Sequence, residues 1–251
     1  MAPKKKRLKQ TIMFHEVLEA CAQPGCPACR LALKSVEGYL DSLFYEFVND
    51  AGIRQHLRRS LGFCREHAWL AIDARFADAL GTGIIYHDLL RLLLRQVPYA
   101  RKRLAARTYP AWFPAGLRSF LARWQFRRQQ EAIPFSSTET CPACRQYQIT
   151  SDIALSALLE FLGDPRMLDA YRASSGLCLP HLRQAMEIER NLEAQFQLLE
   201  LTLIKWTDLK GELHELIRKH DYRFIEQGFG AEGDSWKRAV AAIVGLPSGR
   251  R

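Results

Sequence analysis

The sequence predicts an all-α protein: two related helical modules, each clamped by a Cys3His metal site and joined by a basic helical linker. Three observations lead to this prediction. Cysteine and histidine residues form a duplicated set, apolar residues recur every three or four positions, and no alternating run is long enough for a strand. The chain has 251 residues, 48% of them hydrophobic and 25% charged, as is typical of a globular protein. We expect the modules at residues 11–97 and 136–245, with the linker at residues 98–135.

The duplicated set consists of a C-x2-C pair followed by a G-x-C-x2-H motif. The letters CPACR begin at Cys26 and again at Cys141. From the second cysteine of each pair to the third cysteine there are 35 positions in one copy and 34 in the other. Six of the seven cysteines belong to this pattern, and we interpret the seventh, Cys21, as a small core residue. The candidate metal ligands are Cys26, Cys29, Cys64, His67, Cys141, Cys144, Cys178 and His181.

This pattern is typical of structural zinc sites. Two ligands separated by two residues can bind one ion from the first turn of a helix, and two such pairs complete a Cys3His tetrahedron. Pro27, Pro142 and Pro180 stand at positions that suit a helical first turn, where the helix dipole favours the thiolate. We expect two zinc ions, with ligands paired within each repeat because a shorter loop is easier to close. Pairing between the repeats stays open.

Other functions of the same residues are also considered. An iron–sulfur cluster is an alternative cofactor, since histidine replaces cysteine in some clusters. Each CPAC segment could instead be a redox or sensor dithiol, but the βαβ context of thioredoxin-like motifs is not visible in the sequence. A set of four protein ligands leaves no open position for a catalytic water, and we therefore favour a non-enzymatic protein. A purely structural adaptor is a further alternative.

The apolar pattern predicts similar helices in both repeats. In the first, Leu33, Val36, Leu40, Leu43 and Phe47 share a face, residues 49–52 break the helix, and a short helix follows at 53–59. In the second, Ile153, Ala157, Leu158 and Phe161 share a face, and a short helix follows the break at residues 163–165. More helix is expected at residues 68–97, 182–223 and 236–244. One stripe, predicted to be core or a helix–helix seam, comprises Leu192, Phe196, Leu199, Leu203, Trp206, Leu209, Leu213 and Leu216.

Positive charge is concentrated in two segments. The net charge of the chain is +9, yet residues 89–130 hold ten basic residues and no acidic one, and the first 15 residues add five more. The linker also carries aromatic residues, a combination that can bind phosphates and stack on exposed bases. We expect nucleic acid or another polyanion as a partner, with an anionic membrane surface or a solvated linker as alternatives. The candidate partner-binding residues are Arg101, Lys102, Arg103, Arg107, Arg118, Arg123, Trp124, Arg127 and Arg128.

The sequence favours a cytoplasmic location. No segment approaches the roughly 18 consecutive apolar residues of a membrane span. The basic N-terminus is not followed by a signal-peptide core, because His15 and Glu16 interrupt the apolar stretch. In a reducing compartment the cysteines are expected to be thiols or metal ligands.

The motifs resemble an uncharacterised bacterial family, a domain of unknown function with paired CP-x-C and G-x-C-x2-H motifs. The resemblance spans Thr11 to Gly245 and includes the segments HDYRF at residues 220–224 and EGDSWKRA at residues 232–239. It implies a helical metal-binding protein without an established activity. The charged residues of the two segments could line a polar pocket. We prefer the alternative, in which Asp234 or Ser235 caps the last helix.

Overall fold

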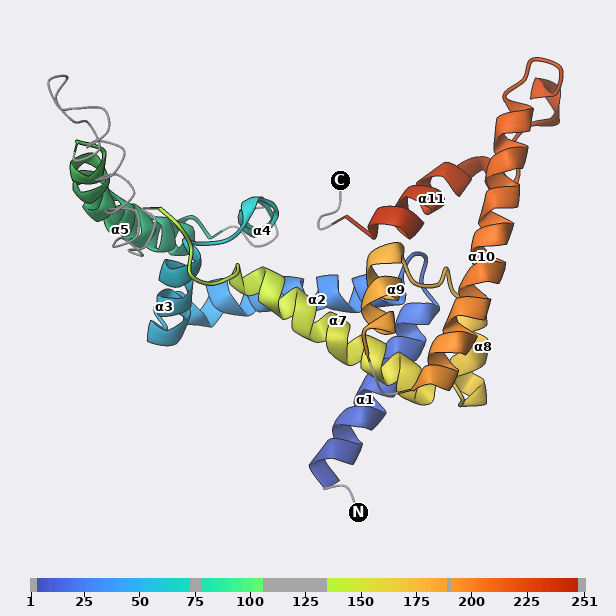
Figure 1. Cartoon of the computed structure of the whole chain (residues 1–251), viewed down its shortest axis with the longest axis horizontal. Coiled ribbons are helices and arrows are strands. Elements are labelled where there is room, and N and C mark those ends of the chain that lie inside the picture. The colour runs from blue at the N-terminus through green and yellow to red at the C-terminus, as the bar shows by residue number, and fades with distance from the viewer. Residues whose placement is uncertain (1–3, 73–77, 106–134, 189–190, 248–251) are drawn as a thin grey trace, which may run out of the picture. The chain divides into compact units, whose positions relative to one another are not determined.

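The computed structural model describes residues 4–72, 78–105, 135–188 and 191–247 (Figure 1). These residues form helices and turns and no strand, which confirms the all-α prediction. The α-helices are α1 (Lys4–Cys21), α2 (Pro27–Ser42), α3 (Ala51–Ser60), α4 (Arg65–Ala71), α5 (Ala79–Ala105), α7 (Pro142–Phe161), α8 (Pro165–Ala173), α9 (Leu179–Met186), α10 (Leu192–Lys219) and α11 (Ser235–Val244). A π-helical turn, Leu43–Phe47, extends α2. None of the described helices combines the length and apolar composition needed to cross a bilayer.

The chain forms two compact units, and each contains parts of both repeats. The first unit consists of residues 1–39 and 146–251, and the second of residues 40–145. Both divisions fall inside helices, within α2 and within α7. The compact units therefore combine segments that are distant in sequence. The expected ranges 11–97, 98–135 and 136–245 follow the order of the repeat along the chain.

The breaks between helices have the same local cause in both repeats. Asp50 precedes α3, and its carboxylate accepts a hydrogen bond from the backbone N–H of Ile53 at 2.8 Å. Asp164 precedes α8 and accepts from the backbone N–H of Arg166 at 2.9 Å. Each aspartate satisfies an amide that the first helical turn leaves without a partner. The repeat thus includes its helix caps as well as its ligand motifs.

The core of the first unit lies where α1, α7, α8, α9 and α10 meet. Its apolar residues include Leu158, Leu162, Met167 and Leu198, all of them essentially inaccessible to solvent. Cys21 belongs to this core as predicted, and burial raises the pKa of its thiol to about 11. From the end of α10, the chain turns through two short 3₁₀ segments, Ile225–Gln227 and Ala231–Asp234, into α11, which runs back toward α9 (Figure 1). This return brings the end of the chain into the first unit.

Only part of the stripe predicted along α10 reaches the core. Leu192, Phe196 and Leu203 are 71%, 68% and 69% exposed, and the buried face of this half of the helix contains Leu198 and Leu201 instead. Further along the helix the prediction holds, since Trp206 packs against the core and Leu216 is buried. A helix with apolar residues on two faces offers two candidate stripes, and periodicity alone cannot select the one that meets the core. The predicted single helix at residues 182–223 is also divided, since α9 ends at Met186 and α10 begins at Leu192.

The C-terminal helix begins where expected but without the expected cap. Asp234 occupies the N-cap position of α11, yet its side chain makes no capping hydrogen bond. Its carboxylate instead accepts from Arg238 Nε at 2.6 Å. The hydroxyl of Ser235 is buried and has no hydrogen-bond partner among the described residues. The prediction of a side-chain cap was therefore wrong, because an ion pair along the helix takes the carboxylate.

Candidate metal centres

All four ligand pairs occupy the same position at the start of a helix. In each G-x-C-x2-H motif the cysteine is the N-cap residue, Cys64 for α4 and Cys178 for α9. In each C-x2-C motif the helix begins at the proline directly after the first cysteine, Cys26 for α2 and Cys141 for α7. The second ligand of each pair follows three residues later and so lies over the same first turn. The prediction that each pair opens a helix is confirmed.

The first cluster joins ligands from different repeats. Cys26, Cys29, Cys178 and His181 converge in the first unit, and their ligand atoms all lie within 4.8 Å of one another. The His181 Nδ1 atom is 3.4 Å from the Cys26 sulfur, 3.3 Å from the Cys29 sulfur and 3.2 Å from the Cys178 sulfur. The sulfurs of Cys29 and Cys178 are 3.6 Å apart. Our expectation of pairing within each repeat was therefore wrong.

The second cluster has the same composition and nearly the same dimensions. Cys64, His67, Cys141 and Cys144 converge in the second unit. The His67 Nδ1 atom lies 3.2, 3.7 and 3.3 Å from the sulfurs of Cys64, Cys141 and Cys144, respectively. The sulfurs of Cys64 and Cys144 are 3.6 Å apart. The structure thus brings all eight predicted ligands into two crosswise Cys3His clusters.

Helix length explains the crosswise pairing. At 1.5 Å per residue, the part of α2 that follows Cys29, up to Ser42, carries the chain about 20 Å away from this ligand. Cys64, which follows the 10-residue α3, belongs to the second unit together with Cys144, whereas Cys29 belongs to the first. The loop-length argument is weak by comparison. Since each doubling of a loop costs about 0.6 kcal/mol, a separation of 149 residues instead of 35 costs only about 1.3 kcal/mol more.

The distances fit a single ion at the centre of each cluster. With metal–sulfur bonds of about 2.3 Å and metal–nitrogen bonds of about 2.0–2.1 Å, tetrahedral ligands lie about 3.75 Å apart for two sulfurs and about 3.55 Å for sulfur and nitrogen. The observed separations of 3.6 Å between sulfurs and 3.2–3.7 Å between sulfur and nitrogen are within a few tenths of an ångström of these values. Both clusters could therefore hold a metal ion with little movement of the side chains.

The electrostatics of the clusters also favour a cation. Burial, together with the neighbouring thiols, raises the pKa of Cys26 well above its ordinary value, and burial likewise raises the pKa of Cys141 and Cys144. Three thiolates in such close contact repel one another unless a positive charge lies between them. Burial lowers the pKa of His67, which leaves its imidazole neutral and able to bind a metal at neutral pH. A divalent ion would replace the protons that otherwise keep the thiols neutral.

Two residues that the sequence did not single out fix the orientation of His181. Its Nε2 atom lies 3.1 Å from the hydroxyl oxygen of Ser151, and this hydroxyl donates a hydrogen bond to the backbone carbonyl of Tyr147 at 2.9 Å. Burial lowers the pKa of His181, but the neighbouring Cys178 and Cys29 sulfurs outweigh it and raise this pKa to about 9, so that the imidazole is protonated without a metal. With an ion bound, the serine oxygen can accept the Nε2 proton, and Nδ1 is then the nitrogen that binds the ion. Such outer hydrogen bonds orient the histidines of metal sites. The Tyr147 hydroxyl also contacts the Cys29 sulfur at 3.7 Å.

The end of the chain covers the first cluster. The backbone N–H of Leu246 donates to the Cys29 sulfur at 3.5 Å. Gly245 has a φ of +88°, and a Cβ atom at this position would lie 3.2 Å from the Cys29 sulfur and 3.6 Å from the Cys178 sulfur. The four ligands of this cluster are all buried, whereas Cys64 and Cys144 of the second cluster are partly exposed. The first cluster is therefore the more enclosed of the two.

Replacement of Gly245 tests this contact. We expect Gly245→Ala to lower the free energy of unfolding by about 2 kcal/mol, because alanine is strained at this φ and its methyl group meets the cluster sulfur. The variant should also lose metal from the first cluster faster in the presence of a chelator. Gly228→Ala is the control, since Gly228 has a φ of +64° and a Cβ there meets no atom within 4 Å. Equal rates of metal loss in the two variants would contradict a role for Gly245 in covering the cluster.

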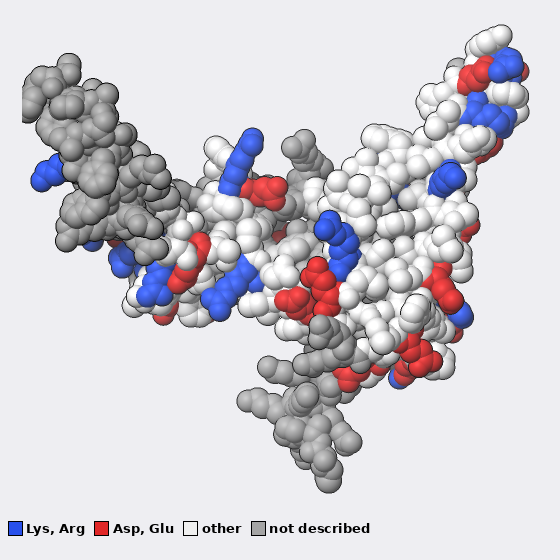
Figure 2. Space-filling model, in the orientation of Figure 1, with Lys and Arg blue, Asp and Glu red and all other residues white. Residues whose placement is uncertain are grey.

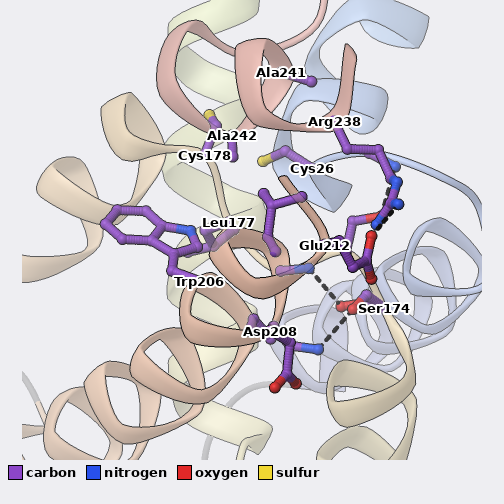
Figure 3. Close-up of a pocket in the computed structure, with 15 residues that line it drawn as sticks. Cys26, Ser174, Leu177, Cys178, Trp206, Asp208, Glu212, Arg238, Ala241 and Ala242 are labelled. Carbon is purple, nitrogen blue, oxygen red and sulfur yellow. Dashed lines mark hydrogen bonds and ion pairs between the residues drawn. The ribbon is translucent and has the colours of Figure 1, made fainter. Parts of the chain in front are cut away.

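A cavity of about 230 Å³ borders the first cluster on another side. Cys26 and Cys178 contribute to its wall, and α10 and α11 enclose it with Trp206 and Ala242 among others (Figure 3). The charged groups that line it are largely engaged: Arg238 binds Glu212, and Lys205 donates to the backbone carbonyl of Ser174 at 2.6 Å. Arg238 is thus the one described charged residue of the EGDSWKRA segment that lines this cavity.

The remaining charged residues of the two C-terminal segments form local ion pairs. Asp221 binds Arg223, with 2.7 Å between their closest atoms, and Glu232 binds Lys219 at 2.7 Å. The Lys219 ammonium group lowers the pKa of Glu232 to about 2. These pairs stabilise the turn between α10 and α11. The described residues do not gather them into one polar pocket.

Most of the predicted partner-binding residues lie outside the described residues. Arg101 and Lys102 are exposed near the end of α5, and the side chain of Arg103 and residues 107–128 are not described. On the face drawn in Figure 2, the charged side chains of the described residues stand in small separate groups on a largely uncharged surface. Of the predicted set, the described side chains are thus those of Arg101 and Lys102, both on the surface of α5.

The fold and the two clusters define a class: helical proteins with two Cys3His sites built from a crosswise repeat. The chain belongs to a family of unknown function, DUF6062, whose model matches residues 7–248. It is also similar to an uncharacterised 23.9 kDa protein in the xynA 3′ region of Caldicellulosiruptor sp. (strain Rt8B.4). The two chains are 25% identical over 231 residues, which cover 91% of this chain and 99% of the relative. No solved structure matches.

Proposed function

We propose that the chain binds two structural zinc ions, one in each Cys3His cluster, and that each ion holds together the helices of its own unit. The observation that carries the proposal is the convergence of three sulfurs and one Nδ1 atom in each cluster, with all four ligand atoms within 4.8 Å of one another. Zinc suits this ligand set, and a complete set of four protein ligands is typical of structural sites. A reducing compartment such as the cytoplasm would keep the six cysteines available as ligands.

The distances favour a single ion over an iron–sulfur cluster. A cluster of two or four irons distributes its protein ligands over different metal atoms. Ligand atoms on different irons lie farther apart than the edges of one tetrahedron. The contacts of 3.2–3.7 Å within each set match one central ion. The redox alternative would need thiols that bind no metal. The iron–sulfur alternative would need the four ligand atoms to move farther apart.

Elemental analysis with an absorption spectrum tests the proposal. We expect protein purified without oxygen to be colourless and to contain two zinc ions per chain. Iron in place of zinc, with visible absorption bands, would contradict zinc and favour the sensor alternative. Protein without bound metal after growth in zinc-supplemented medium would contradict both.

A polyanion, nucleic acid in particular, is the partner that we propose for the basic segment at residues 89–130. The support is its unopposed charge of +10 together with interleaved aromatic residues. Binding should weaken steeply as salt rises, because cationic side chains release counterions from phosphates. Failure to bind a single-stranded oligonucleotide even at low salt would contradict this part of the proposal and leave the metal sites unaffected.

A further inference from the structure

A cavity in the second unit is lined by more basic than acidic side chains. It has a volume of about 510 Å³ and lies between α3 and the first half of α5. Three arginines line it, Arg54 and Arg58 from α3 and Arg91 from α5. The one carboxylate in its lining is that of Asp88, and His87 is the remaining titratable group there. With His87 neutral, the lining carries a net charge of +2.

The aspartate holds the arginines in place without using all their donors. Arg58 Nε donates to Asp88 Oδ2 at 2.6 Å, and Arg54 Nη2 lies 3.1 Å from the same oxygen. Arg91 Nη2 is 3.8 Å from Asp88 Oδ1, too far for a direct hydrogen bond. Each guanidinium has five N–H groups. One carboxylate therefore leaves several donors directed toward the cavity or the solvent around it.

The burial of these groups distinguishes the cavity from a solvated basic surface. The side chains of Asp88 and Arg54 are only 9% and 15% exposed, whereas those of Arg58 and Arg91 are 44% and 60% exposed. The inner ion pair between Arg54 and Asp88 is thus fixed, and the two outer arginines remain accessible. Such an arrangement preorganises planar donors for an oxyanion, the geometry that arginine provides for phosphate.

The helix terminus at this cavity plays a smaller part. Ala79 and Leu80, the first residues of α5, also line it. The carboxylate of Asp78, however, accepts from the backbone N–H groups of Leu80 and Gly81 at 3.1 and 2.8 Å. These amides are therefore already satisfied, and recognition rests on the guanidinium groups.

We propose that Arg54, Arg58 and Arg91 form a binding site for a phosphate group. This site is separate from the metal clusters and from the exposed cations at the end of α5. A phosphate could belong to a small phosphorylated molecule or to a nucleic-acid backbone. Both present tetrahedral oxygens that fit the fork of donors. Arg91 is free to turn toward the phosphate, because its guanidinium makes no direct hydrogen bond to Asp88.

Calorimetric titration of the full metal-loaded chain with inorganic phosphate tests the site. We expect saturable binding of one phosphate per chain at low salt. Arg91→Gln should weaken it about tenfold, the usual effect of losing one charge-assisted hydrogen bond. This variant should fold normally, since the arginine is exposed and does not hydrogen-bond to Asp88. Arg54→Gln should weaken binding at least as much.

Arg95→Gln is the matched control. Arg95 lies one turn further along α5, is exposed and does not line the cavity. It should leave phosphate affinity within about twofold of the original. Absence of saturable phosphate binding, or equal weakening by Arg91→Gln and Arg95→Gln, would overturn the site. Neither outcome would bear on the zinc proposal, because the metal content is measured in the same samples.

A second titration identifies the source of the phosphate. It is carried out in the presence of a single-stranded oligonucleotide without terminal phosphates. If the oligonucleotide competes with inorganic phosphate, and Arg91→Gln weakens its binding too, the site takes the phosphodiester backbone. If phosphate binds equally well with and without the oligonucleotide, the site takes a small phosphorylated ligand. Either result supports the site.

Discussion

Replacement of Cys178 by serine is expected to release one of the two metal ions and to unfold the first unit at a much lower temperature. An ion in the first cluster would join the start of α2 to the start of α9, two segments about 150 residues apart. Structural zinc binding contributes on the order of 10 kcal/mol of apparent folding free energy, comparable to the whole stability of a domain. We expect the unfolding temperature to fall by on the order of 10 °C or more. Calorimetry and metal analysis of the same sample measure both effects.

Cys21→Ser is the matched control for this variant. Cys21 is also buried in the first unit, at 3% exposure, but it lies outside the cluster. The same exchange of sulfur for oxygen should cost only about 1–3 kcal/mol there and leave both ions bound. Hydrogen exchange in Cys178→Ser should increase in the first unit and change little around Cys64 and Cys144 in the second. Retention of both ions with unchanged stability in Cys178→Ser would refute the role of the cluster as a clamp.

Two double variants are expected to differ completely in metal content. Cys26→Ser combined with Cys178→Ser removes two ligands from one cluster, and this protein should keep one ion. Cys26→Ser combined with Cys64→Ser removes one ligand from each cluster, and this protein should keep none. The measurement is mass spectrometry under native conditions after passage over a chelating resin, which removes ions held by three ligands.

The single variants and the alternative pairing complete the test. Cys26→Ser, Cys64→Ser and Cys178→Ser should each keep one ion. Pairing within the repeats would reverse the two double variants: Cys26 with Cys64 would leave one ion, and Cys26 with Cys178 would leave none. The stabilities should follow the same rule, since two substitutions in one network are not additive whereas substitutions in separate sites are.

Local features of this protein could be predicted from the sequence. The spacing of two residues between ligands places both over one helical turn, and the structure has all four pairs at helix starts. The breaks at residues 49–52 and 163–165 were also predicted, and the structure adds their local cause, since Asp50 and Asp164 occupy the N-cap positions of the helices that follow. These features depend on residues within one turn of each other. Such short-range geometry can be predicted from residue type and spacing alone.

The partners of each ligand pair could not be predicted in the same way. They depend on how far α2 and α7 carry the chain before it turns, and on which helices then lie side by side. Ser151 and Leu246, which support the first cluster, lie 30 residues before His181 and 217 residues after Cys29. Neither belongs to a motif. The exposed first half of the α10 stripe is a similar case, since burial is decided by the neighbouring helices and not by periodicity.

The sequence by itself determined the class of fold, the eight ligands and the chemistry that they favour. Each of these follows from residue type and from spacing within a helical turn. Only the tertiary structure decided that the repeats exchange their ligands, that the end of the chain covers one cluster, and that three arginines surround Asp88. The physical reason is the rigidity of the helices. The part of α2 that follows Cys29 is a rod of about 20 Å, and the loop entropy of about 1.3 kcal/mol that favours the shorter pairing is too small to bend it.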